Sequence, residues 1–457
     1  MYATQQIYNR ITDYLKENKS LADAALTVFV RVLAAGLAYG VQVFIARYLA
    51  LEEFGIYVTL WTWLIVAHFV GVFGFSESSL RFLPRYTERK QYHWAIGFMK
   101  TGFWFSTLGA TCVGIVGLIA IWILQDEISA NYLIPLIVLS VGLPIMSLEL
   151  YLEGISRAFG WYLLTVIPAF AIRPVLIAFG VLISILLGYT PNAALVLSLA
   201  VVITLGTVLV QSFIILTRIK KIFGSLDGTG SKKFWVTSSL PLMLSTGVDE
   251  LYIWSDILIL GFMAPAPEVA VYFAAQRTMS LASFIQYAFM LVSAREFSLA
   301  NAMRDKKELQ SRISSATRWT FWMTVPAVGI TFAAGYPLLY LFGPEFVSGI
   351  SIMGVLGLGL IIRSSVGQAS ELLIILGHQY INLAVSAGGL LFNIIFSIYL
   401  IPIYGILGAA IATTITFTLR ALTLTLITKK LTGLWVLADF PELTHKTNAK
   451  PKLAKLN

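Results

Sequence analysis

Residues 24–76 read AALTVFVRVLAAGLAYGVQVFIARYLALEEFGIYVTLWTWLIVAHFVGVFGFS, which is two long apolar runs joined by a short turn at Glu52 and Glu53. A helix needs about 20 mostly apolar residues to cross about 30 Å of hydrocarbon, and each run meets that length. Ten similar runs follow, so the predicted spans are 24–50, 54–76, 95–124, 132–153, 161–188, 191–217, 236–263, 268–294, 316–342, 349–376, 380–402 and 405–428. The sequence therefore predicts an all-α, polytopic membrane protein with twelve transmembrane helices.

The composition agrees with a membrane protein. Hydrophobic residues make up 58% of the chain and charged residues only 12%, whereas a soluble domain carries about 25% charged residues. The formal charge of +9 comes largely from loops between the spans, where it is explained by orientation in the bilayer rather than by nucleic acid. A single cysteine, Cys112, excludes an intrachain disulfide. The predicted environment is the lipid bilayer, with no nucleic-acid partner.

Lysine and arginine alternate from one side of the predicted bundle to the other. The linkers 76–94, 218–234 and 295–315 and the tail 429–457 are basic, whereas the other connections carry almost no lysine or arginine. By the positive-inside rule both termini are predicted to be cytoplasmic. Residues 1–23 fit either an interfacial helix on the cytoplasmic leaflet or a disordered leader, and both interpretations stay open.

The two halves of the chain repeat weakly. Residues 53–57 (EFGIY) resemble 268–272 (EVAVY), and Ala193-Ala194 resemble Ala409-Ala410, at offsets of 215 and 216 residues. Because six spans separate the copies, the halves are predicted to form two pseudo-symmetric, parallel six-helix bundles, which is a transporter architecture. The predicted parts are an N-terminal segment, an N-terminal lobe, a basic linker, a C-terminal lobe and a basic tail, at 1–23, 24–217, 218–235, 236–428 and 429–457.

Motifs for covalent chemistry are scarce. Residues 228–232 (GTGSK) lack the spacing and the preceding strand of a phosphate-binding loop. The four histidines share no metal-ligand spacing, and the connections on the side away from the basic linkers are too short to hold a glycosyltransferase site. The sequence predicts a transporter without catalytic residues, metal or cofactor, and not an enzyme.

Ionisable residues inside the spans are the predicted functional groups. Each costs roughly 2.5 to 3.5 kcal/mol at mid-membrane, so they are expected to face a watery cavity or one another. Arginine presents a fork of donors that matches phosphate oxygens. The predicted substrate-binding residues are Arg277, Arg363, Arg173 and Arg31, and the predicted ion-coupling residues are Asp249, Glu250, Asp256 and Glu371. The alternatives are pairing of Arg363 with Glu371, pairing of Arg277 with the acids of residues 236–263, and snorkelling of Arg31 and Arg420 to the headgroups.

Several short motifs, in their order and spacing, resemble one family over essentially all twelve predicted spans. They are ARYLALEEFGIY (46–57), GFSESSLRF (74–82), LFGPEF (341–346), LGH (376–378) and YGILGAA (404–410). This pattern resembles the polysaccharide flippases of the multidrug/oligosaccharidyl-lipid/polysaccharide exporter superfamily.

The resemblance implies a function. It implies a two-lobed bundle in the bacterial cytoplasmic (inner) membrane that turns undecaprenyl-diphosphate-linked oligosaccharide units across the membrane for O-antigen, exopolysaccharide or capsule assembly. It also implies a cationic central cavity, with Arg277 and more weakly Arg31 at cavity positions, and partners in the polysaccharide polymerase and chain-length machinery. Coupling to H⁺ or Na⁺ stays open. The alternatives are a peptidoglycan-precursor flippase, an ion-coupled drug antiporter and a non-transporting subunit of a polysaccharide synthase.

Overall fold

The computed structural model describes residues 33–224, 227–287, 306–366 and 369–438, together with residues 289, 293 and 297. Within these residues the chain is helical, with no strand. Eight described helices are long and apolar enough to cross a membrane, or nine if one bent pair counts as a single span. The chain is therefore a multi-pass, all-α membrane protein. The count of twelve spans stays a prediction, and the interfacial helix suggested for 1–23 lies outside the described residues.

The helices follow one another through short connections. The first half contains a helix at 33–48, α2 (Leu51–Gly71), α3 (Phe75–Glu88), α4 (Tyr92–Leu124), α5 (Ala130–Ala158), α6 (Tyr162–Ile167), a π-helical turn (Pro168–Ile172), α7 (Arg173–Leu186) and α8 (Ala193–Phe223). The second half contains α9 (Lys232–Met263), α10 (Ala266–Ser280), a 3-10 turn (Leu281–Ser283), α12 (Lys306–Ala333), α13 (Gly335–Phe342), a 3-10 turn (Pro344–Gly349), α14 (Ile350–Ser365), α15 (Ala369–Ile375), α16 (Gln379–Tyr404) and α17 (Ile406–Thr432).

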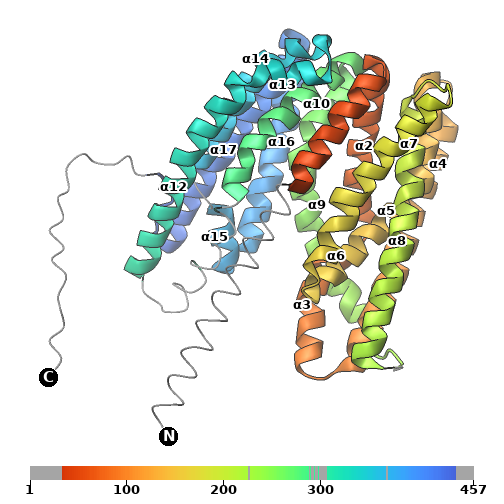
Figure 1. Cartoon of the computed structure of the whole chain (residues 1–457). Coiled ribbons are helices and arrows are strands. Elements are labelled where there is room, and N and C mark those ends of the chain that lie inside the picture. Colours follow the sequence, from red (N-terminus) through yellow and green to blue (C-terminus); the bar gives the residue numbers. More distant parts are fainter. Residues whose placement is uncertain are drawn as a thin grey trace, which may run out of the picture.

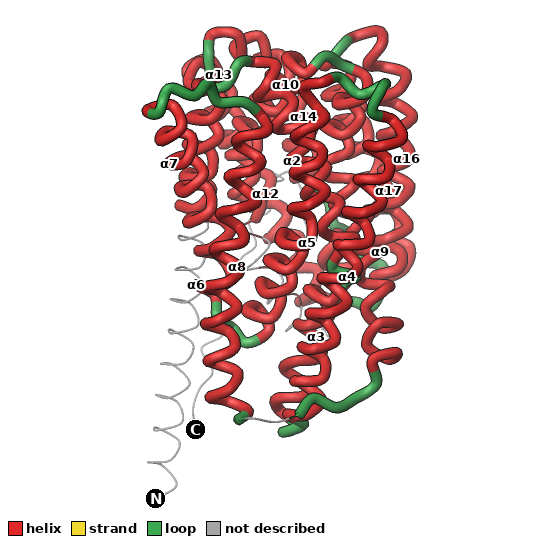
Figure 2. The backbone as a smooth tube through the Cα atoms, turned by 90° about the vertical axis from the view of Figure 1, so that its right-hand side faces the viewer, coloured by secondary structure: helices red, strands yellow, loops and turns green. Residues whose placement is uncertain are grey.

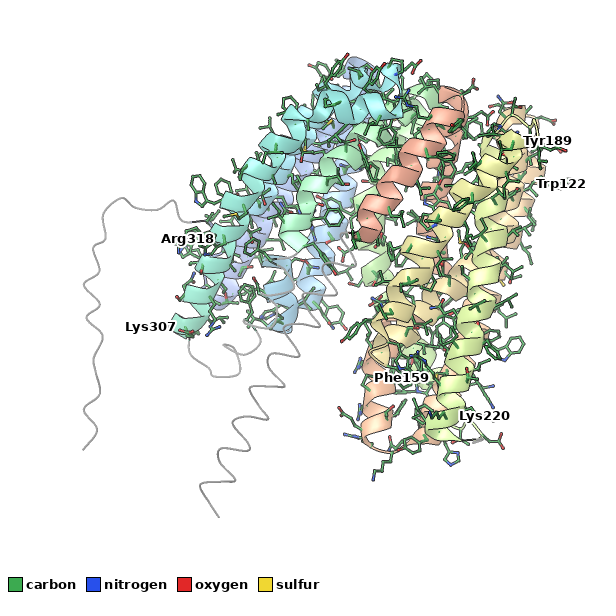
Figure 3. The ribbon with its side chains drawn as sticks, in the orientation of Figure 1. Trp122, Phe159, Tyr189, Lys220, Lys307 and Arg318 are labelled. Carbon is green, nitrogen blue, oxygen red and sulfur yellow. The ribbon has the colours of Figure 1, made fainter. Side chains whose placement is uncertain are left out.

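The helices form two groups that meet at one end and diverge toward the other (Figure 1). Seen at 90° to that view, most of the long helices run along one common direction (Figure 2). Lys220 and Lys307 lie at the diverging end, called the basic end here, whereas Trp122 and Tyr189 lie at the opposite end (Figure 3). The ends where the groups meet, around α2 and α10, are called the closed end. This placement agrees with the alternation of basic and lysine-poor connections.

Several predicted spans are broken in the structure. The predicted linker 76–94 is mostly helix α3, because Gly74 at φ 70° turns the chain after α2 and lets a second helix begin. The predicted span 316–342 is bent by 56° between α12 and α13, where Pro337 cannot donate a backbone hydrogen bond to the previous turn. The predicted span 349–376 is likewise divided into α14 and α15.

The helix opens beside Arg173. The π-helical turn Pro168–Ile172 ends immediately before Arg173-Pro174. The ring of a proline clashes with the carbonyl four residues earlier and provides no N–H, so the wider turn relieves the backbone there. This turn places Arg173 on the inner side of the bundle.

At the closed end the two groups are in backbone contact. A Cβ atom on Gly55 of α2 would lie 1.8 Å from the carbonyl oxygen of Ala266 at the start of α10. The ring of Phe54 packs against the rings of Phe273 and Phe346, at 6.0 and 5.8 Å between centroids. Arg47 donates a hydrogen bond of 2.6 Å to the backbone carbonyl of Leu341. Backbone contact at Gly55 and packed aromatic rings at Phe54 together seal the closed end.

Helix α9 contacts both groups. Its Trp235 is buried beside α3 and donates a hydrogen bond of 2.9 Å to the Tyr86 hydroxyl, and Ser239 lies 2.7 Å from Ser78 through their hydroxyls. Farther along, α9 packs against α16 and α2. The start of α9 thus packs on the first group, although the sequence assigns residues 236–428 to the C-terminal lobe. The lobe boundaries stay predictions.

The internal repeat has a structural counterpart. Tyr57 and Tyr272 are both buried and lie 215 residues apart. Gln42 donates to the Tyr57 hydroxyl at 3.5 Å, and the Tyr272 hydroxyl donates to Asp256 at 2.7 Å. Gln42 and Asp256 lie 15 and 16 residues before their tyrosines, each in the preceding helix, so each half ties its second helix to its first through a buried tyrosine.

Candidate functional site

A cavity of about 490 Å³, called the central cavity here, lies among α2, α5, α7, α9 and α10. This volume is in the range of small-molecule sites, which are about 300 to 1,000 Å³. Its described ionisable lining consists of Arg157, Arg173, Arg277, Glu77, Glu149, Glu153, Glu250 and His68. The lining is therefore of mixed sign, with three arginines against four glutamates, rather than simply cationic.

Arg173 is held by a buried ion pair. Its guanidinium donates to the Glu149 carboxylate of α5, and the two side chains are only 16% and 8% exposed. The guanidinium also lies 5.3 Å from the ring centroid of Trp61. Such a pair neutralises both charges, so Arg173 faces the cavity as half of a neutral pair.

We expect Glu149→Gln to destabilise the protein, because it leaves Arg173 as an uncompensated buried cation. Breaking a buried pair in this way costs about 3 to 5 kcal/mol. The measurement is the midpoint of thermal unfolding in detergent. Glu77→Gln is the matched control, since its partner Arg157 is 29% exposed and keeps Glu153 at 3.7 Å. Equal losses in both variants would contradict a structural role for the Glu149 pair.

Arg277 differs from the other arginines of the central cavity. Its guanidinium carbon lies 5.3 Å from the ring centroid of Trp254 and 5.4 Å from that of Phe273. It makes no ion pair with any carboxylate in the part of the chain that the structure describes. A cation on aromatic faces, with no carboxylate partner, keeps its donors available for an incoming anion.

Arg277 also lines a second cavity, of about 360 Å³, between the helix at 33–48 and α10, called the bridging cavity here. Gln42 and Arg277 line both the central and the bridging cavity. The other described polar side chains of the bridging cavity are Tyr39, Ser280, Ser283 and Tyr287, and none of its described lining residues is a carboxylate. The positive charge of the site is thus concentrated at Arg277.

The acids of α9 are separated by the structure. Glu250 faces the central cavity and accepts a hydrogen bond of 3.1 Å from the Trp254 indole. Asp256 is 2% exposed and lines neither the central nor the bridging cavity. It accepts hydrogen bonds from Tyr272 and Gln276. Asp249 lines a third cavity, where it lies 3.8 Å from Arg420. None of these three acids of α9 forms an ion pair with Arg277 among the described residues. The ion-coupling role of these acids stays a prediction.

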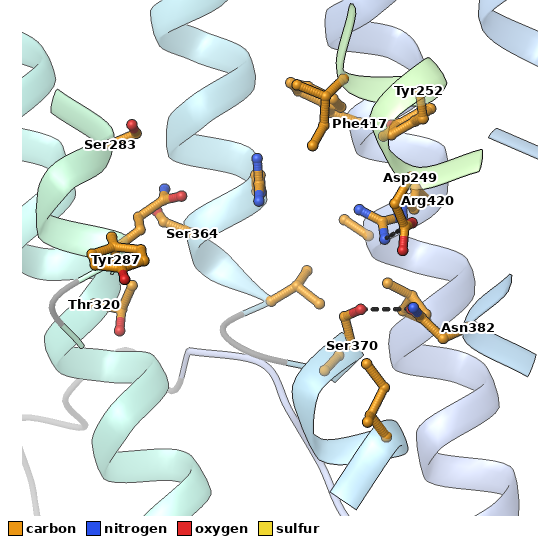
Figure 4. A pocket seen from close by; sticks show the side chains of 18 residues that line it. Asp249, Tyr252, Ser283, Tyr287, Thr320, Ser364, Ser370, Asn382, Phe417 and Arg420 are labelled. Carbon is orange, nitrogen blue, oxygen red and sulfur yellow. Dashed lines mark hydrogen bonds and ion pairs between the residues drawn. The ribbon is translucent and has the colours of Figure 1, made fainter. Parts of the chain in front are cut away.

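A third cavity of about 450 Å³, called the C-lobe cavity here, lies among α9, α12, α14, α15 and α17 (Figure 4). Arg363 lines it and lies 5.7 Å from the ring centroid of Phe417. Arg420 also lines it, where it lies 3.8 Å from Asp249 and donates to Ser386 at 3.0 Å. Snorkelling of Arg420 to the headgroups is therefore wrong, because its charge is held inside the bundle. The position of an arginine within its apolar run did not predict whether the side chain would reach the headgroups or pair inside the bundle.

Two predicted site residues cannot be placed. Arg31 lies outside the described residues, and the side chain of Glu371 is not among those described. Snorkelling of Arg31 and pairing of Arg363 with Glu371 therefore stay open. The structure brings Arg173 and Arg277 together at the central cavity and places Arg363 in the C-lobe cavity.

The fold and these cavities define a polytopic helical membrane protein with a transporter architecture. A multidrug resistance transporter of the MATE family in an inward-facing conformation matches with a TM-score of 0.72 at 16% identity, over 87% of this chain and 94% of that one. The lipid II flippase MurJ, in an inward closed conformation, matches at 0.68 and 16%, over 89% and 87%. A MOP superfamily transporter from Pyrococcus furiosus matches at 0.64 and 19%, over 89% and 93%.

Sequence comparison assigns the family. Residues 20–295 match the family model described as polysaccharide biosynthesis protein, and the chain belongs to this family. A probable flippase of Haloferax volcanii, AglR, is 27% identical over 180 residues. That match covers 37% of this chain and 37% of the relative, so the chain spans just over a third of that protein's length.

Proposed function

We propose that this protein is a flippase that moves undecaprenyl-diphosphate-linked oligosaccharide units across the cytoplasmic membrane for O-antigen, exopolysaccharide or capsule assembly. The family membership and the probable flippase among its relatives support a lipid-linked substrate. The observation that carries the proposal is Arg277, a membrane-embedded arginine without a carboxylate partner in the described chain, between two cavities. Its donors match the oxygens of a diphosphate.

The mechanism that follows is alternating access. The contact of α2 with α10 closes one end, and the helix groups diverge at the basic end. With the basic end toward the cytoplasm, the site would first receive the diphosphate headgroup from the inner leaflet. Rocking of the two groups would then open the α2–α10 contact and expose the same site to the other side. No covalent bond changes, and coupling to H⁺ or Na⁺ and docking of a polymerase are parts of the proposal.

Transport is tested with purified protein in liposomes that contain fluorescent undecaprenyl-diphosphate oligosaccharide. The readout is the fraction of label that an added membrane-impermeant quencher reaches with time. We expect the protein to accelerate equilibration between leaflets, compared with protein-free liposomes. Equal rates with and without protein would overturn the proposal. Movement of lipid II or of a cationic drug instead would favour the peptidoglycan-precursor or drug-antiporter alternative.

A further inference from the structure

The guanidinium of Arg277 is held by aromatic rings. Its carbon lies 5.3 Å from the ring centroid of Trp254, on α9, and 5.4 Å from that of Phe273, one turn earlier on α10. No hydrogen bond or ion pair joins this guanidinium to any residue that the structure describes. Since an arginine side chain has many rotamers, the position of this charge depends on the two rings.

Arg173, at the same cavity, shows what the aromatic contact leaves available. Its guanidinium also lies 5.3 Å from a tryptophan ring centroid, that of Trp61, but it donates in addition to the Glu149 carboxylate. A carboxylate neutralises an arginine and occupies its N–H donors. The face of an aromatic ring attracts the cation through its quadrupole and leaves those donors for oxygen atoms. Trp254 therefore holds Arg277 without neutralising it.

The indole of Trp254 is itself fixed by a contact within α9. Its Nε1 donates a hydrogen bond of 3.1 Å to the carboxylate of Glu250, one turn earlier. The side chain is half-buried and packs against the hydrophobic core. Tryptophan combines a large ring face with an N–H donor, whereas phenylalanine keeps only the face and leucine has neither. The hydrogen bond to Glu250 therefore sets the orientation of the ring that Arg277 meets.

Glu250, Trp254 and Arg277 all line the central cavity and form one sequence of contacts along its wall. We infer that Trp254 is a positioning residue of the diphosphate site: its ring holds the Arg277 guanidinium at the cavity wall before the substrate arrives. Such preorganisation raises affinity, because the rotamers of the arginine are already restricted when the anion binds. This inference rests on the proposed function. The other role open to a tryptophan at a cavity wall is stacking on a sugar ring, which the experiment distinguishes.

The experiment measures dissociation constants of the purified full chain in detergent for two lipids, undecaprenyl diphosphate without sugar and the same lipid with a trisaccharide. Trp254→Leu removes the ring and its N–H, and is expected to raise both constants about tenfold, or about 1.4 kcal/mol. Trp254→Phe keeps a ring face and should raise both about threefold. Trp122→Leu makes the matched change at a tryptophan of α4 that is 72% exposed (Figure 3) and should leave both constants as in the wild type.

A double-mutant cycle shows whether Trp254 acts through Arg277. In the Arg277→Gln protein, Trp254→Leu should weaken binding no further, because the group that it positions is absent. The thermal unfolding midpoint is measured for each variant. If Trp254→Leu does not fold, the smaller change Trp254→Phe serves in the same cycle.

Three results would overturn the inference while leaving the proposed function intact. They are wild-type affinities in a folded Trp254→Leu protein, effects of Trp254→Leu and Arg277→Gln that add in full, and a loss confined to the lipid that carries the trisaccharide. The last of these would assign Trp254 to sugar stacking. If the wild type binds neither lipid and does not accelerate their movement in liposomes, the proposed function itself fails.

Discussion

Arg277→Gln is expected to reduce transport of the lipid-linked oligosaccharide about 100-fold in reconstituted liposomes. The side chain is the positive group shared by the central and bridging cavities, and its guanidinium has no carboxylate partner in the described chain. Hydrogen bonds to a charged group contribute about 1.5 to 3 kcal/mol each, and a bidentate contact with phosphate makes two of them. Glutamine keeps a similar length but supplies neither the charge nor the fork.

Two further variants show whether charge or geometry is responsible. Arg277→Lys keeps the charge as a point and is expected to retain an intermediate rate. Arg318→Gln makes the same change at an exposed arginine of α12 (Figure 3) and should transport like the wild type. Protein amount and thermal stability are measured for each variant. If a folded Arg277→Gln protein transports like the wild type, Arg277 does not bind the diphosphate.

Gly55→Ala is expected to slow the transport cycle by hindering closure between α2 and α10. The added Cβ would lie 1.8 Å from the carbonyl oxygen and 2.4 Å from the carbonyl carbon of Ala266. These are backbone atoms, so the helices must separate rather than one side chain rotate. Overpacking of this kind costs about 1 to 3 kcal/mol, and the closed end loses stability by that amount. We expect transport to fall about tenfold, which corresponds to about 1.4 kcal/mol.

The accompanying measurement is hydrogen–deuterium exchange over 51–60 and 266–275, where protection should fall in Gly55→Ala. Gly206→Ala is the matched control, because the same change in α8 meets no atom within 4 Å. The control should keep wild-type transport and exchange. Normal transport by Gly55→Ala, with unchanged protection, would show that the α2–α10 contact is not a moving closure.

The fold could be predicted from the sequence to a large extent because the bilayer imposes one dominant rule. Each long apolar run must satisfy its backbone hydrogen bonds internally, so runs such as 95–124 and 191–217 correspond to α4 and α8. The basic linkers likewise predicted which connections share an end. Helix α3 was missed because its seven buried residues alternate with charges, and a polar amphipathic helix after Gly74 resembles a loop in composition.

The candidate site was predictable only in part. A charge deep in an apolar run indicates a functional or paired residue, which identified Arg173, Arg277 and Arg363. The partner of such a charge depends on how the helices pack, and the spacing of residues along the sequence does not reveal that packing. Arg173 pairs with Glu149 from a different helix, and Asp249 pairs with Arg420 far along the chain. In both pairs the two residues belong to different helices and meet only because those helices pack together.

Three properties could be predicted from the sequence: the chain crosses a membrane many times, several of its connections are basic, and some charges lie within apolar runs. These properties depend on local composition, because hydrocarbon penalises each exposed polar group wherever it lies. Three other properties result from helix packing: Glu149 neutralises Arg173, Arg277 stands between two cavities, and Gly55 lies against the backbone of Ala266. These depend on close approach of distant helices, and a shift of an ångström or two would abolish them.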